Sequence, residues 1–132
     1  MIYIGENVSD YIKQLRTEMI KVYGMNCWLD ENWLWRRNNL LTLHHIRELR
    51  NGGKTCWNNS ALLGRTSHIY LNYLDREYHK IYNELNGAFK DLNITYKPPT
   101  DEYYEEINRI LRKVKRRWRY YLITNLLTWT LI

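Results

Sequence analysis

Two short apolar runs on either side of a glycine-bearing loop constrain the fold of this chain more than any other feature. The first run covers residues 40–46 and contains Thr42, which favours a strand over a helix. An Asn-Gly-Gly sequence at 51–53 marks the loop, and the second run covers residues 60–63. Because both runs are short and turn residues separate them, we predict that they pair as a hairpin.

The segment after this hairpin has the apolar periodicity of a helix. Thr66 or Ser67 can cap its start, and the apolar face continues to about Gly87, which would end it. Residues 89–96 would then be a connection. We therefore expect one continuous helix to follow directly on the second strand.

A further apolar stripe at helical spacing covers residues 7–23. Ser9 is its candidate N-cap and Gly24 its natural C-cap. The tryptophan-rich residues 25–37 are compatible with either a loop or a short irregular helix.

The C-terminal part of the chain, residues 100–132, follows a break at two adjacent prolines. Thr100 is expected to cap a long helix whose first turns are acidic and whose later turns are basic, a polarity that suits the helix dipole. An apolar tail, residues 120–132, would pack on the body of the protein or on a partner chain.

The chain of 132 residues is short enough for one domain over 1–132, and its 45% hydrophobic content can supply a core. We predict an α+β fold that is mostly helical. A small β-hairpin followed by a helix would form its centre over residues 40–86, with one helix before it and a long helix after it.

The formal charge of +6 favours a polyanionic partner, above all nucleic acid. The last helix carries a basic block with Trp118 inside it, and such a block can contact phosphates while the aromatic ring stacks on bases. An ordinary solvated helix face would show the same composition. The block consists of Lys113, Lys115, Arg116, Arg117 and Arg119.

The N-terminus has neither a basic segment nor a long apolar segment, and no apolar run has the length of a membrane span. We therefore expect an intracellular, cytoplasmic protein without a membrane partner. A disulfide between Cys27 and Cys56 is not expected in that setting, and the absence of a Cys-x-x-Cys pair excludes a thiolate zinc knuckle.

Three of the four histidines fall between Leu41 and Asn72. His44 and His45 are adjacent at the end of the first run, so a strand would place them on opposite faces. His68 and Asn72 are four residues apart and would share one helix face. If the strand packs on the helix, two imidazoles and an amide oxygen can converge on one divalent cation.

The order of these residues resembles the HNH endonuclease family, or ββα-metal fold. The family has a His-His or Asp-His pair on a first strand, an Asn after a long loop, and a His-x-x-x-His or His-x-x-x-Asn step on a helix. This chain has His44-His45, Asn59 and His68-x-x-x-Asn72 in these places. It lacks the accessory zinc cysteines of many members and ends the motif in Asn, as an HNN-like variant.

The resemblance implies a role for each residue of the motif. His44, His68 and Asn72 would bind one divalent metal, His45 would be the general base, and Asn59 would orient the loop and hydrogen-bond the base. Asn58 is an alternative to Asn59. An amide oxygen in the ligand set favours Mg²⁺ or Mn²⁺, with Zn²⁺ or Ni²⁺ as alternatives. Basic side chains near the motif would clamp a phosphate or remain a solvated surface: Arg47, Arg50, Lys54 and Arg65.

Three classes of function are compatible with this pattern. The resemblance favours a small metal-dependent nuclease acting on DNA, of the kind found in phages and mobile elements. The second class is a non-catalytic relative that binds nucleic acid, or binds another nucleic-acid enzyme as a regulator or inhibitor. The third is a helical interaction protein with incidental histidines, which would bind another protein through its aromatic and apolar tail.

Overall fold

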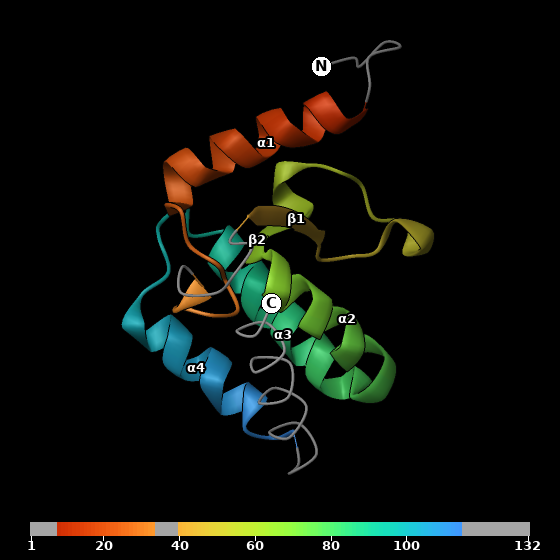
Figure 1. The fold of residues 1–132 in the computed structure, drawn as a ribbon, viewed down its shortest axis with the longest axis vertical. Helices are drawn as coiled ribbons and strands as arrows, with labels where there is room; N and C mark the ends of the chain where they lie inside the picture. Colours follow the sequence, from red (N-terminus) through yellow and green to blue (C-terminus); the bar gives the residue numbers. More distant parts are fainter. Residues whose placement is uncertain (1–7, 34–39, 115–132) are drawn as a thin grey trace, which may run out of the picture.

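A computed structural model describes residues 8–33 and 40–114 of the chain, and Figure 1 shows its elements. The predicted α+β class is confirmed: a two-stranded hairpin lies among four α-helices. The elements are α1 (Val8–Tyr23), β1 (Leu41–His45), the single 3-10 turns η2 (Leu49–Asn51) and η3 (Trp57–Asn59), β2 (Ser60–Gly64), α2 (Arg65–Glu77), α3 (His79–Asn93) and α4 (Asp101–Leu111).

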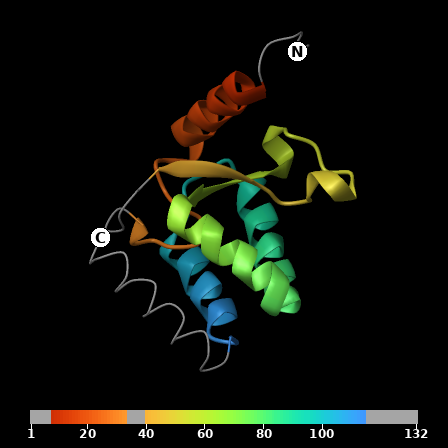
Figure 2. The ribbon, with the colours of Figure 1, turned by 45° about the vertical axis from the view of Figure 1, so that its right-hand side comes forward.

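The predicted hairpin is confirmed, with β1 and β2 antiparallel and His45 paired with Ser60. All five residues of β2 are buried, because helices cover the hairpin on both faces. Figures 1 and 2 show α1 on one side of the hairpin and α2, α3 and α4 on the other. The hairpin is therefore the middle layer of the domain, and the chain passes directly from β2 into α2.

The prediction of one continuous helix up to Gly87 is wrong. The helix is interrupted at Tyr78, whose φ of −142° and ψ of 61° are not helical. A second helix, α3, then continues to Asn93. An unbroken helix over 65–93 would be roughly 40 Å long at 1.5 Å per residue. The break lets α3 pack back on α2 and β2, so that Leu85 and Phe89 enter the core.

The expected helix ends are partly confirmed. Gly24 follows α1 with a φ of +82°, and Thr100 Oγ1 accepts a hydrogen bond from the Tyr103 amide at 3.1 Å. Ser9 lies inside α1 instead of capping it. The last helix ends at Leu111, before the expected basic turns, and residues 115–132 lie outside the described part. None of the described helices is long and apolar enough to cross a bilayer.

The segment between α1 and β1, as far as residue 33, is an irregular connection that belongs to the core. Cys27, Trp28 and Trp33 are buried there. Two tyrosine hydroxyls of α4 donate to its carbonyls, Tyr103 to Trp28 at 2.5 Å and Tyr104 to Cys27 at 2.7 Å. These two tyrosines therefore pack against the segment and also hydrogen-bond its backbone.

Candidate functional site

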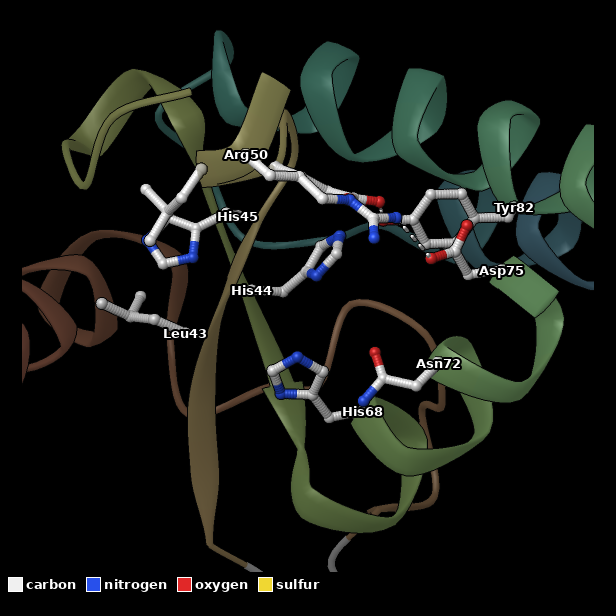
Figure 3. Close-up of a pocket in the computed structure, with 10 residues that line it drawn as sticks. Leu43, His44, His45, Arg50, His68, Asn72, Asp75 and Tyr82 are labelled. Carbon is white, nitrogen blue, oxygen red and sulfur yellow. Dashed lines mark hydrogen bonds and ion pairs between the residues drawn. The ribbon is translucent and has the colours of Figure 1, made fainter. Parts of the chain in front are cut away.

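A hollow of about 420 Å³ opens where the end of β1 meets α2 and α3. Four residues predicted from the motif line it, namely His44, His45, His68 and Asn72 (Figure 3). The hairpin brings the first two and the start of α2 brings the others. The remaining lining residues are Leu43, Glu48, Leu49, Arg50, Asp75 and Tyr82.

His44 is the most buried of the site histidines, with 5% of its surface exposed. Its Nε2 lies 2.7 Å from Oδ1 of Asn86, a buried residue of α3. Burial lowers the pKa of His44 to about 4, although the hydrogen bond to Asn86 acts in the opposite direction. The imidazole is therefore neutral at pH 7, as a metal ligand must be.

His68 lies in the first turn of α2, and its ring faces that of His44 in Figure 3. The two ring centroids are 5.5 Å apart and the planes meet at 84°. Nδ1 of His68 lies 2.8 Å from the hydroxyl of Thr42. Burial lowers the pKa of His68, with a smaller contribution from His45. The exposed Asn72 lies one turn further along α2, beside these rings.

His45 lies on the opposite side of β1 from His44, as the strand prediction requires (Figure 3). Its Nε2 is 2.8 Å from Oγ1 of Thr55, and partial burial lowers its pKa. Thr55 is itself held from α1, because Tyr11 donates its hydroxyl hydrogen to the Thr55 carbonyl at 3.1 Å. His45 is thus held in a fixed orientation at the edge of the hollow.

Asn59 fastens the loop between the two strands. Its Oδ1 accepts a hydrogen bond from the Arg47 amide at 2.7 Å, and its Nδ2 donates to the carbonyls of Arg47 and Lys54 at 2.9 Å each. The predicted role in orienting the loop fits these contacts. Among the hydrogen bonds that Asn59 makes with described residues, none is to His45, which was the expected contact. Asn59 instead holds the loop that carries Thr55, and Thr55 is the residue hydrogen-bonded to His45. Asn58, the alternative candidate, is exposed.

Two glycines allow the close turn of this loop. Gly52 has a φ of +88°, a backbone conformation that residues other than glycine rarely adopt. A Cβ atom on Gly53 would lie 1.9 Å from the carbonyl oxygen of Arg47. The loop geometry therefore depends on both glycines as well as on Asn59.

Arg50 is the one predicted phosphate contact, among those the structure describes, that lines the hollow. It extends from η2 across the hollow, forms an ion pair with Glu48 and lies 3.9 Å from Asp75 of α2 (Figure 3). Its guanidinium is three-quarters exposed, so a phosphate can reach it.

The other predicted cationic contacts are placed differently. Nε of Arg47 donates a hydrogen bond to the Asn51 carbonyl at 2.8 Å, within its own loop. Lys54 and Arg65 are exposed but do not line the hollow. Lys113, just after α4, is 2.5 Å from Glu84 of α3. The remaining four, Lys115, Arg116, Arg117 and Arg119, lie outside the described residues.

Several residues of the site were not predicted from the sequence. Asp75 lies three residues after Asn72 and shares the helix face that the motif defines, so spacing alone would have found it. Asn86 interrupts the apolar stripe of α3 between Leu85 and Phe89, and a polar residue at a core position is the signal for a buried partner. Thr42 and Thr55 carry no such signal.

The donor atoms of this hollow fit an open cation site and not a closed structural one. Two neutral imidazoles and one amide oxygen, from His44, His68 and Asn72, would leave coordination positions for water and substrate. Within residues 8–33 and 40–114, no three His, Cys, Asp or Glu side chains are grouped closely enough to hold a metal ion. In a site with three protein ligands, Asn72 would supply the third beside the two histidines that line the same hollow.

No protein-family model, curated protein or solved structure matches this chain.

Proposed function

We propose that this protein is a metal-dependent endonuclease of the HNH type that hydrolyses phosphodiester bonds in DNA. The observation that supports this most directly is the meeting of His44, His68 and Asn72 in the hollow that His45 enters from the other face of β1. This set comes from two separate segments of the sequence pattern, β1 and α2. A hairpin followed by a helix is also the scaffold that the HNH resemblance implies.

In this proposal His44, His68 and Asn72 hold one divalent cation, with Mg²⁺ or Mn²⁺ preferred because the amide oxygen is a hard ligand. When bound, the cation stabilises the negative charge of the transition state and of the leaving 3′ oxygen. Burial lowers the pKa of both His44 and His68, which favours the unprotonated imidazoles that this role requires.

His45 is the general base of the proposed reaction. Burial lowers its pKa, which favours the neutral imidazole that can accept a proton from the attacking water. Thr55 orients its ring, and Asn59 holds the loop in which Thr55 follows Lys54. Arg50 reaches into the same hollow and would exchange its pairing with Glu48 for the scissile phosphate.

DNA is the proposed substrate because the chain carries a formal charge of +6. The test uses the purified full chain with supercoiled, linear and single-stranded DNA, and with Mg²⁺, Mn²⁺, Ni²⁺ and Zn²⁺ in turn. We expect cleavage with at least one cation, and loss of cleavage in the His45→Ala variant. Absence of cleavage under all of these conditions would contradict the proposal.

A second candidate function is a non-catalytic HNH-like protein that binds nucleic acid or regulates another nucleic-acid enzyme. It is favoured by the absence of a third His, Asp, Glu or Cys ligand among the described residues. Salt-dependent DNA binding that needs no divalent cation, together with no cleavage, would support this function over the first.

A further inference from the structure

In His44 and in His68, one ring nitrogen is already hydrogen-bonded to another side chain of the protein. These bonds involve different atoms: Nε2 of His44 faces Asn86, and Nδ1 of His68 faces Thr42. A neutral imidazole has one N–H group and one nitrogen with a free lone pair. The partner of the first nitrogen therefore decides which nitrogen can bind a cation.

The tautomer of His68 follows from the hydroxyl group of Thr42. That hydroxyl has a single hydrogen, and it donates it to the Leu63 carbonyl at 2.9 Å. Toward His68 the hydroxyl oxygen can then only accept, over a distance of 2.8 Å. Nδ1 of His68 must therefore carry the hydrogen, which leaves the lone pair on Nε2.

The tautomer of His44 follows from the atom of Asn86 that faces it. Oδ1 of the Asn86 amide lies 2.7 Å from Nε2 of His44, and an amide oxygen only accepts a hydrogen bond. Nε2 of His44 must carry the hydrogen, which leaves the lone pair on Nδ1.

We infer that Asn86 and Thr42 are positioning residues that hold His44 and His68 in opposite tautomers, so that a divalent cation in the hollow is bound by Nδ1 of His44 and Nε2 of His68. The cation part of this inference rests on the proposed function, whereas the tautomers concern the metal-free protein. The arrangement also explains why a buried asparagine interrupts the apolar stripe of α3. Its amide oxygen holds the strand histidine in place from α3.

The direct test is long-range ¹H–¹⁵N NMR of the metal-free full chain at pH 7.5, with the ring nitrogens assigned. We expect Nε2 of His44 and Nδ1 of His68 to show shifts of protonated nitrogens, and the other nitrogen of each ring to show the shift of an unprotonated one. The reverse tautomer at either histidine, or an equal mixture of both, would overturn the inference. This readout requires neither metal nor activity.

Variants then separate positioning from structure. Asn86→Leu and Thr42→Val remove the fixing partner, and each should mix the tautomers of its histidine and weaken Mn²⁺ binding about 10- to 100-fold. Asn86→Asp and Thr42→Ser keep an acceptor in place, so they should retain the wild-type tautomer. Asn83→Leu, an exposed site on the same helix, is the matched control and should change neither quantity. Unchanged tautomers in both Asn86→Leu and Thr42→Val would contradict the inference.

These results also distinguish failure of this inference from failure of the proposed nuclease. If the wild-type tautomers are as inferred but Mn²⁺ and Mg²⁺ do not bind, the cation ligation and the nuclease fall together. If a cation binds and DNA is cleaved while the tautomers differ, the nuclease stands and the roles of Asn86 and Thr42 are wrong.

Discussion

The rings of His44 and His68 lie 5.5 Å apart and nearly perpendicular, although one lies near the end of a strand and the other in the first turn of a helix. The contact exists because β2 passes into α2 without an intervening loop, and because β1 pairs with β2 in a register that sets Leu41 opposite Gly64. The two histidines therefore form a rigid part of the molecule, and their position does not depend on a mobile loop.

The first prediction concerns stability and pH in the metal-free protein. His44 has a folded pKa of about 4, below the unfolded value near 6.5, so between these values the unfolded state binds a proton that the folded state does not. The free energy of unfolding should therefore be undiminished above pH 6.5 and fall by roughly 3 kcal/mol as pH decreases to 4. Urea unfolding with a chelator present, from pH 7 to 4, measures this loss.

The control for this experiment is His44→Gln, which keeps a donor for Asn86 but cannot titrate. Its stability should fall less steeply with acid than that of the wild type. Some pH dependence will remain, since burial also lowers the pKa values of His45 and His68. Parallel curves for the two proteins would show that His44 is not held neutral by the fold.

The second prediction concerns the loop between the strands. Asn59→Ala removes three hydrogen bonds to Arg47 and Lys54, and should lower the free energy of unfolding by about 1–3 kcal/mol. Asn58→Ala, an exposed neighbour, should change it by less than about 0.5 kcal/mol. Urea denaturation compares the two variants. Equal effects would mean that Asn59 does not fasten the loop.

The hairpin and the placement of the motif could be predicted because local rules decide them. Turn residues at 51–53 and two short apolar runs leave few alternatives to a hairpin, and the spacing of His68 and Asn72 fixes a shared helix face. The break at Tyr78 could not be predicted, because no glycine or proline marks it. The break allows α3 to pack against α2 and β2, which is a tertiary contact that local sequence rules do not encode.

The partners of the site residues were likewise beyond the sequence. Asn86 and Thr42 are polar residues at half-buried or buried positions, and their hydrogen bonds depend on which elements meet. For the basic block the composition was readable from the sequence, but the position of its side chains was not. Of its members, only Lys113 falls in the described part, and it pairs with Glu84 instead of lying at the hollow.

The third prediction concerns metal binding and thermal stability. A cation that binds only the folded protein stabilises it by about 2.7 kcal/mol at one hundred times its Kd. Mn²⁺ or Mg²⁺ should therefore raise the melting temperature of the wild type, and His68→Ala should abolish the rise. His79→Ala, an exposed histidine that does not line the hollow, should retain it. A rise that persists after loss of both His44 and His68 would place the metal elsewhere.

The fourth prediction concerns Arg50. Replacing it with Gln removes the cation that reaches into the hollow, so cleavage and DNA affinity should both decrease, and the slope of log K against log salt should become shallower by about one. Arg65→Gln alters an exposed arginine at the start of α2 that does not line the hollow, and should leave cleavage close to wild type. Fluorescence titration over a range of salt concentrations gives the slope. A larger effect from Arg65 than from Arg50 would move the phosphate contact out of the hollow.

The last prediction separates the two adjacent histidines. His45 lies across β1 from His44, hydrogen-bonded to Thr55 and not to Asn86, so the strand assigns the two rings to different tasks. His45→Ala should reduce cleavage about 10²- to 10⁴-fold, the usual cost of losing a general base, while Mn²⁺ affinity stays as in the wild type. His44→Ala should also reduce cleavage, but by weakening Mn²⁺ binding, because it removes a ligand. Calorimetric titration with Mn²⁺ therefore distinguishes two variants that look alike in a cleavage assay. If His45→Ala loses Mn²⁺ affinity as His44→Ala does, His45 is a ligand and the division of roles across the strand is wrong.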